Sequence, residues 1–311
     1  MTSKVSDPGV FGRVAVAMGG YAAEREISLT SGGAVLRALL RRGVDAVGVE
    51  LNRLLLQPLM DQGFDRVFNI VHGRGGEDGV LQGALEAIDL PYTGGGVLGS
   101  ALSMDKLRTK MCWDSGGLPT PAWCLLSSEA DIERCGSQLG FPTIVKPALE
   151  GSSIGMSKAS DSQELRRAWE LAAKSGCDVL AEVWIEGQEY TVGILDETLL
   201  PIIRLETPNE FYDYDAKYCA DTTRYLIPCG LTNAQEIEMQ QLALQAFRSV
   251  AASGWGRVDL FLDNSGDTWL IEVNSVPGMT DHSLVPMAAN AAGIEFDELV
   301  WRILETSLDD D

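Results

Sequence analysis

In the first third of the chain, short apolar runs alternate with longer segments whose apolar residues have helical spacing. This pattern changes after about residue 98. Short apolar runs separated by glycine-rich turns predict strands at residues 13–18, 44–51, 66–73 and 90–94. Helical spacing of the apolar residues predicts helices within 24–43 and 79–88. Because strands that alternate with helices form βαβ units, residues 1–98 are expected to form an α/β domain around a parallel sheet.

The remaining two thirds favour two smaller α+β lobes, at residues 99–188 and 189–311. In the first lobe the pattern predicts a helix over 101–116, strands at 143–147, 154–160 and 178–187, and a helix over 162–176. In the second it predicts a strand at 189–195, helices over 234–254 and 292–307, and strands at 257–263 and 268–274. The last two strands are joined by the turn sequence NSGD, which is typical of a β-hairpin.

Carboxylates interrupt the apolar pattern of this hairpin. Asp259 lies two residues after Arg257, and Glu272 lies two residues before Asn274, so each pair shares one face of its strand. If the hairpin pairs around its turn, Asp259 and Glu272 are neighbours, and two buried carboxylates repel unless a cation joins them. Oxygen ligands suit Mg²⁺, and Arg257 on the same face suits a developing oxyanion. The alternative is an exposed hairpin face with solvated acids.

A second group of residues is suited to phosphate. No Walker A motif occurs, but Lys146 ends an apolar strand and is followed by the small-residue loop 151–155. Backbone N–H groups of such a loop can enclose phosphates while the lysine contacts an oxygen. Lys106 and Lys217 are candidates for completing the cationic set. Taken singly, each lysine is more typical of a solvated surface.

Two short motifs favour other functions and are weaker. GGGVLG at 94–99 matches a dinucleotide fingerprint, yet it does not follow the first strand, where that fingerprint belongs. GSSIG at 151–155 matches a nucleophile elbow around Ser153, yet the chain is predicted to continue as a strand instead of a helix. Neither a nicotinamide site nor a serine hydrolase is therefore favoured.

Polar residues also gather at the predicted carboxyl edge of the parallel sheet, where such sheets bind ligands. His72, Arg74, Glu77 and Asp78 lie among four glycines after the third strand. Glu24 begins the first helix at the same edge. A first-turn glutamate usually complements the helix dipole, and Asp78 is suited to capping the next helix. Near a substrate amine, however, Glu24 would act as an anchor.

Composition limits the partners. The 311 residues carry 24 basic and 45 acidic side chains, a net charge of −21, which disfavours nucleic acid and anionic membranes. Six cysteines without a Cys-x-x-Cys pair favour a reducing, cytoplasmic setting. No apolar run approaches the ~18 residues of a membrane span. A site for a polyphosphate must therefore gather its few lysines locally.

Ordered motifs along nearly the whole chain resemble those of the D-alanine–D-alanine ligases of the ATP-grasp superfamily. The matching segments are GGYAAEREISLTSG, VHGRGGEDGVLQG, LPYTGGGVLGSALSMDK, VKPALEGSSIGMSK, FYDYDAKY, GWGRVDLFLD and EVNSVPGMTDHSLVPMAA. The resemblance implies a Rossmann-like substrate domain at 1–98 and an ATP-grasp domain made of a central lobe, 99–188, and a C-terminal lobe, 189–311. It also implies that ATP binds between the two lobes.

The resemblance implies a role for each matching residue. Asp259, Glu272 and Asn274 would hold Mg²⁺ or Mn²⁺, with two ions per site. The nucleotide would contact Lys106, Lys146, Glu182, Trp184, Ile185, Glu189, Phe211 and Lys217. The first D-alanine would be held by Glu24 with Ser152 and Tyr218. Ser283 and Leu284 would bind the carboxylate of the second D-alanine, while Arg257 and the Gly278 N–H would bind the oxyanion. His72 would be a further substrate-binding residue.

The implied activity is ATP-dependent ligation of two D-alanines through an acyl phosphate, for peptidoglycan synthesis, by a cytoplasmic homodimer. Residues 206–225 would form a lid that excludes water. Tyr218, instead of a phenylalanine, favours the dipeptide over a D-lactate depsipeptide. A D-alanine–D-lactate ligase and a nucleotide-binding protein without turnover are the alternatives.

Overall fold

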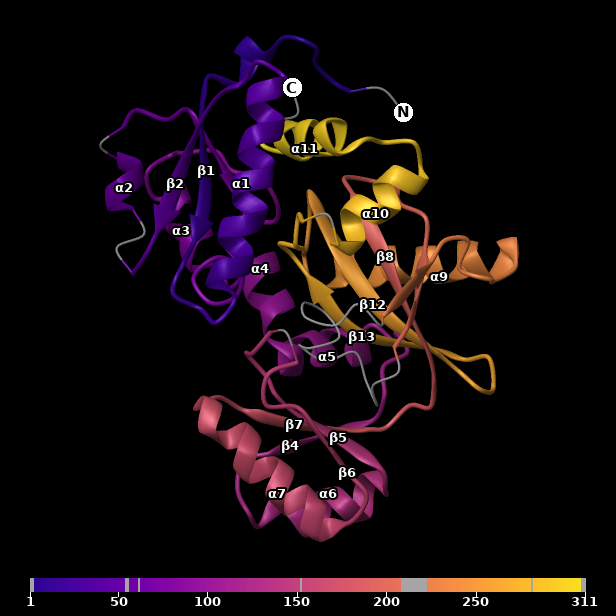
Figure 1. Ribbon diagram of the computed structural model, residues 1–311. Helices are drawn as coiled ribbons and strands as arrows, with labels where there is room; N and C mark the ends of the chain where they lie inside the picture. Colours follow the sequence, from indigo (N-terminus) through magenta and orange to yellow (C-terminus); the bar gives the residue numbers. More distant parts are fainter. Residues whose placement is uncertain are drawn as a thin grey trace.

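A computed structural model of the chain describes residues 3–53, 56–60, 62–151, 153–207, 223–280 and 282–308. These residues form three sheets, which follow one another along the chain (Figure 1). The first sheet is parallel, and every pair of strands in the other two is antiparallel. The predicted order, a parallel α/β domain followed by two α+β lobes, is confirmed.

The N-terminal sheet has the strand order β2-β1-β3. The elements of this part are η1 Pro8–Phe11, β1 Arg13–Gly19, α1 Arg25–Arg41, β2 Asp45–Leu51, α2 Gln57–Met60, β3 Arg66–Asn69 and α3 Val80–Glu86. All of β1 after its first residue is buried, as a central parallel strand covered on both faces requires. The predicted fourth strand is reduced to one parallel bridge, between Tyr92 and Val67.

The central sheet has the order β4-β7-β5-β6 and lies at the bottom of Figure 1, with α6 and α7 on one face. The elements of this part are α4 Val97–Met104, α5 Lys106–Ser115, β4 Trp123–Leu126, α6 Asp131–Leu139, β5 Thr143–Pro147, β6 Ser157–Ala159, α7 Ser162–Ala172, η2 Ala173–Ser175 and β7 Val179–Val183. The single helix predicted over 101–116 is wrong, because Asp105 has extended backbone and its side chain caps α5.

The C-terminal sheet has the order β11-β10-β8-β12-β13, with β9 paired to β8. The elements of this part are β8 Gly187–Leu195, β9 Thr198–Leu199, β10 Ile203–Glu206, β11 Arg224–Leu226, α9 Asn233–Ser249, β12 Trp255–Asp263, β13 Thr268–Asn274, α10 Leu284–Ala291 and α11 Phe296–Glu305. The helix predicted over 292–307 begins later, at Phe296. Gly293, in left-handed backbone with φ +78°, separates it from α10.

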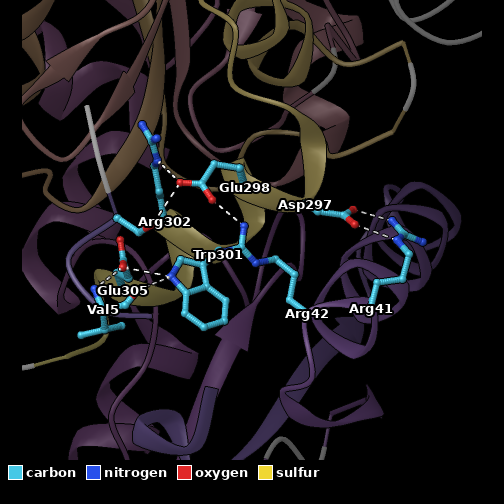
Figure 2. Close-up of polar contacts among 9 residues, drawn as sticks. Val5, Arg41, Arg42, Asp297, Glu298, Trp301, Arg302 and Glu305 are labelled. Carbon is cyan, nitrogen blue, oxygen red and sulfur yellow. Dashed lines mark hydrogen bonds and ion pairs between the residues drawn. The ribbon is translucent and has the colours of Figure 1, made fainter. Parts of the chain in front are cut away.

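The last helix packs against the first domain. Arg42 forms an ion pair with Glu298 and stacks over the Trp301 ring at 4.4 Å, while Arg41 pairs with Asp297 (Figure 2). Beneath these contacts the rings of Phe11 and Trp301 meet edge to face, with centroids 4.9 Å apart. The N-terminal domain and the C-terminal lobe therefore share one hydrophobic core. No helix among the described residues combines the length and hydrophobicity needed to cross a membrane.

Candidate active site

A cleft with an empty volume of about 750 Å³, open solvent included, lies between the central and C-terminal sheets. Eight residues predicted for the nucleotide or the metal line it, namely Lys106, Lys146, Glu182, Trp184, Ile185, Glu189, Asp259 and Glu272. The remaining lining residues are mostly apolar, and they include Ile144, Met156, Val183, Phe261 and Ile271.

The β12–β13 hairpin forms one wall of this cleft. Asp259 and Glu272 are directly paired across it, as the sequence predicted, and the register shifts immediately afterwards so that Leu260 faces Leu270. Ile271 is the extra residue of this β-bulge. The bulge sends Leu270 into the core while the consecutive side chains of Ile271 and Glu272 both reach the cleft. An apolar contact and a carboxylate therefore lie side by side on one strand.

Asp259 is the most connected side chain of the wall. Its carboxylate accepts two hydrogen bonds from Arg257, both 2.8 Å, one from the Thr191 hydroxyl at 2.7 Å and one from the Asn274 amide at 3.0 Å. These bonds fix its orientation although the side chain is buried. The amide nitrogen of Asn274 faces Asp259, which directs the amide oxygen to the other side.

The oxygen atoms of this wall fit a hard divalent cation. Glu272 lies 3.3 Å from the Lys106 ammonium, and Asp259, Glu272 and Asn274 supply only oxygen ligands. Magnesium characteristically takes one or two carboxylates and completes its shell with water and phosphate oxygens. Within the described residues, no group of three or more His, Cys, Asp or Glu is suited to a metal.

Three buried charged side chains lie at the opposite wall, and two of them, Lys146 and Glu182, line the cleft. Lys146 on β5 and Lys110 on α5 pair with the two oxygens of Glu182 on β7, at 2.6 and 3.2 Å. Burial is the largest single influence on the pKa of Glu182 and raises it. The charges and hydrogen bonds of the two lysines together outweigh burial and hold this pKa below its ordinary value. Sequence reasoning missed Lys110. Lys110 closes the basic segment KLRTK, whose composition is typical of a solvated surface, and nothing local indicates that it is buried.

One part of the cleft lining is suited to a planar base. Trp184, Ile185 and Glu189 line it, and the Lys158 ammonium lies 4.3 Å from the centre of the Trp184 ring. Phe261 and Ile271 approach from the hairpin. The lining therefore combines apolar side chains with lysines and carboxylates, and a ligand with both an apolar and an anionic part, such as ATP, fits it.

Glu24 lies where the N-terminal domain meets the central lobe. It is buried at the start of α1 and makes no capping hydrogen bond, so it does not act as a simple cap. A Cβ atom at Gly73 would lie 2.7 Å from its Oε2, and one at Gly151 would lie 2.6 Å from its Oε1. Both glycine motifs therefore bring backbone close to this carboxylate.

Glu77 is a second carboxylate beside Gly73, whose N–H donates to Glu77 Oε2 at 2.7 Å. Removal from water raises the pKa of Glu77 to about 8, and the nearby Glu24 carboxylate adds to this rise. The hydrogen bond from Gly73 and the charges of Lys106 and Arg257 oppose it. Glu77 therefore carries a proton for most of the time at neutral pH.

His72 joins this loop to the segment after β13. Burial lowers the pKa of His72 to about 4, so the ring is neutral. Nδ1 lies 2.9 Å from the Val276 carbonyl, which can only accept, and Nε2 lies 3.3 Å from the Ser31 hydroxyl. The same hydroxyl accepts the Met279 N–H at 3.1 Å. His72 thus fixes the position of the backbone on both sides of Gly278.

Ser283 and Leu284 stand at the start of α10, whose N–H groups and dipole favour a carboxylate. Ser283 Oγ accepts the Thr280 N–H at 2.9 Å and lies close to Gly278, where an added Cβ atom would be 2.9 Å away. The residues predicted for the second amino acid therefore lie within one turn of chain.

Four predicted site residues, Ser152, Phe211, Lys217 and Tyr218, lie outside the described residues, as does most of the predicted lid at 206–225. The described ends of that segment are paired, because Glu206 on β10 faces Arg224 on β11. Both ends of the predicted lid are thus attached to the C-terminal sheet.

An antiparallel lobe bearing buried lysines, facing a second lobe bearing paired carboxylates across a cleft, defines the ATP-grasp class of ligases. Two family models match the chain, "D-ala D-ala ligase C-terminus" over residues 112–305 and "D-ala D-ala ligase N-terminus" over residues 56–95. The chain belongs to the D-alanine–D-alanine ligase family, which is ATP-dependent.

Individual relatives agree with this assignment. The D-alanine–D-alanine ligase of Methylococcus capsulatus is 64% identical over 307 residues, which cover 99% of both chains. The Bacillus anthracis D-alanine–D-alanine ligase complexed with ATP is 33% identical, with a TM-score of 0.83 over 95% of this chain and 96% of that one. The VanG D-Ala:D-Ser ligase of Enterococcus faecalis is 27% identical, with a TM-score of 0.84 over 95% and 99%.

Proposed function

We propose that the chain joins two D-alanines into D-alanyl-D-alanine for peptidoglycan synthesis, with release of ADP and phosphate. The observation that carries the proposal is that the Asp259–Glu272 pair, with Lys106 beside Glu272, lines the same cleft as Lys146. A carboxylate is a poor acyl donor because its oxygen does not leave. Its attack on the γ-phosphorus of ATP gives an acyl phosphate, whose phosphate leaves readily.

The cleft residues would bind ATP in one orientation. Glu182, Trp184, Ile185, Glu189 and Phe211 would surround the base and ribose, while Lys106, Lys146 and Lys217 would contact the phosphates. Asp259, Glu272 and Asn274 would hold Mg²⁺ or Mn²⁺, with two ions per site. The cation supplies charge neutralisation at the phosphate oxygens. The carboxylates of the β12–β13 hairpin would therefore determine where the triphosphate of ATP lies.

The first D-alanine would bind beside α1. Glu24 would hold its ammonium group in a hydrogen-bonded set with Ser152 and Tyr218, which leaves its carboxylate directed at the phosphate end. Glycines at 73 and 151 leave room for this arrangement around Glu24. The segment 206–225 would close over the site and exclude water, which otherwise hydrolyses an acyl phosphate.

The second D-alanine would bind at the start of α10. Ser283 and Leu284 would hold its carboxylate, and its neutral amine attacks the carbonyl carbon of the acyl phosphate. Arg257 and the Gly278 N–H would stabilise the oxyanion of the tetrahedral intermediate. The two-point pair with Asp259 holds Arg257 in place, and His72 holds the chain around Gly278.

We also propose a homodimer in a bacterial cytoplasm, without nucleic acid or membrane as a partner. The domain division 1–98, 99–188 and 189–311 belongs to the same proposal. The last boundary falls inside β8, after the second residue of this strand, which spans Gly187–Leu195.

The test is release of ADP and phosphate by the purified chain with D-alanine or L-alanine, with and without magnesium. We expect release only with D-alanine and magnesium together, and equimolar formation of the dipeptide. Release that does not depend on D-alanine would contradict the proposal, and binding of ADP without any turnover would favour the nucleotide-binding alternative.

A D-alanine–D-lactate ligase is the alternative within the family, and the likeness to a D-Ala:D-Ser ligase shows that this fold accepts other second substrates. D-Lactate needs no deprotonation of an amine, so competition at low pH is the most sensitive comparison. Product analysis with both substrates between pH 6 and pH 9 separates the two. We expect the dipeptide throughout.

A further inference from the structure

Lys110, which neither the motifs nor the proposed ATP contacts include, belongs to a chain of buried charges behind the cleft. Its ammonium lies 3.2 Å from Glu182 Oε2, donates to the Thr120 hydroxyl at 2.6 Å and contacts the Pro121 carbonyl at 3.3 Å. Only 1% of its side chain is exposed. All three N–H donors of Lys110 thus have protein partners, and its ammonium is directed at the back of Glu182.

A count of charges distinguishes Lys110 from a simple packing residue. Glu182 carries one negative charge, and Lys146, at 2.6 Å, would cancel it alone. Because Lys110 supplies a second positive charge, the three side chains together carry one positive charge in excess. Lys146 and Glu182 line the cleft, so this excess charge faces the space where phosphates are proposed to bind. In a chain of net charge −21, such a local charge determines whether a polyphosphate is attracted.

We propose that Lys110 is a positioning residue of the nucleotide site, which neutralises Glu182 from behind so that Lys146 keeps its charge for the phosphates. This inference rests on the proposed function, because it takes Lys146 as a phosphate contact. Lys110 itself touches no substrate.

A second set of hydrogen bonds leads from Lys110 to the β12–β13 hairpin, which carries Asp259 and Glu272. The Thr120 hydroxyl, which accepts from Lys110, donates to the Leu270 carbonyl at 3.3 Å. The Leu270 N–H in turn donates to the Pro119 carbonyl at 2.8 Å. Leu270 directly precedes Ile271, the extra residue of the bulge, and Glu272 follows it on the same strand. Lys110 therefore connects the wall that carries Lys146 to the strand that carries Glu272.

The charge of Lys110 depends on pH in the alkaline range. Burial lowers the pKa of Lys110 to about 8; the facing Glu182 carboxylate on β7 and Asp114 on α5 raise it, and Lys146 on β5 lowers it. Lys110 is charged below this pH and neutral above it. The excess positive charge at the cleft is accordingly present at neutral pH and disappears as the pH rises past about 8.

The first experiment measures the affinity of Mg·ADP by titration calorimetry, and the KM values of ATP and D-alanine, in the full-length Lys110→Met variant. We expect the Kd of Mg·ADP and the KM of ATP to rise about tenfold or more, with the KM of D-alanine changed less than about twofold. Lys174→Met is the matched control, since it removes one positive charge from an exposed site. An unchanged Kd, or an equal rise in both KM values, would overturn the proposal.

A charge-compensating variant separates positioning from folding. In Lys110→Met/Glu182→Gln, Lys146 is again left with one uncompensated positive charge. We expect the double variant to bind Mg·ADP more tightly than Lys110→Met alone. The affinity of Glu182→Gln alone completes the comparison. If the loss in binding free energy of the double variant equals the sum of the losses in the two single variants, Lys110 only fills space and the proposal is overturned.

The pH profile is the third readout. We expect the affinity of the wild-type chain for Mg·ADP to fall above about pH 8, and that of Lys110→Arg to stay level there because arginine keeps its charge. Identical profiles for the two would contradict the inference. If the wild-type chain itself neither binds Mg·ADP nor turns over D-alanine, it is the proposed function that fails.

Discussion

Asp259 and Glu272 are directly paired across the β12–β13 hairpin, and the bulge that follows them lies at the next position. Without the shift in register, Leu270 would share a face with Glu272, and a core leucine would lie in the cleft. The bulge therefore allows one strand to serve both the core and the site. Bulges beside active sites commonly have this role of redirecting a side chain.

Glu272→Gln should lower kcat roughly 100-fold or more while the fold is retained, because an amide replaces one of the two negative charges proposed to bind the cation. Turnover measured against magnesium concentration, with circular dichroism as the check on folding, tests this. Asp267→Asn, at the exposed turn of the same hairpin, is the control and should stay near wild-type activity. Normal turnover in Glu272→Gln would show that the carboxylate binds no catalytic metal.

Tyr218→Phe should increase depsipeptide formation relative to dipeptide when D-lactate and D-alanine compete. The reason is the proposed hydrogen-bonded set of Tyr218 with Glu24 and Ser152, which the phenylalanine removes without a large change of shape. The product ratio across pH 6 to pH 9 is the measurement. A ratio that does not change would remove Tyr218 from second-substrate selection.

His72 should make the chain sensitive to acid. Its pKa is about 4 when folded, against 6.5 in the unfolded chain, so only the unfolded chain takes up this proton between those values. The free energy of unfolding should fall as pH drops through this window, by up to about 1.4 kcal/mol per pH unit from this residue. In His72→Gln that contribution to the slope should be absent. His282→Gln, at the exposed second histidine, should keep the wild-type slope. Equal slopes in all three chains would contradict the assignment.

Glu77 should make the free energy of unfolding depend on pH in the opposite direction to His72. Its folded pKa, about 8, lies above the ordinary 4.5, so the folded chain holds this proton more tightly. The stability contribution is complete below pH 4.5 and is lost as pH rises to about 8. Glu77→Gln should therefore unfold at a higher temperature than wild type at pH 8.5, and the difference should shrink toward pH 5. The surface variant Glu133→Gln should show no such pH-dependent gain.

The hairpin was predictable from the sequence because its information is local. Alternating apolar residues, a four-residue turn and carboxylates at Asp259 and Glu272 are all visible within 18 residues, 257–274. The bulge was not predictable, since it depends on how Leu270 packs in the core. The same holds for Glu24, whose position could be expected at the sheet edge but whose neighbours Gly73 and Gly151 come from distant motifs.

Elements with few apolar residues were missed. The helix α6 buries only Ile132 and Cys135, and their spacing of three residues is too short a signal to stand out. Lys110 was missed for a different reason. Its partners Thr120 and Glu182 come from separate elements, so only the folded chain shows that this lysine is buried.

The two ends of the chain are tied together by the contacts around α11. The Val5 N–H donates to Glu305 Oε1 at 2.9 Å, and the Trp301 indole donates to the Val5 carbonyl at 3.2 Å (Figure 2). The first and last described segments of the chain therefore lie side by side. A circularly permuted gene, with the old ends fused through a few residues and new ends cut into an exposed loop, should consequently encode the same architecture.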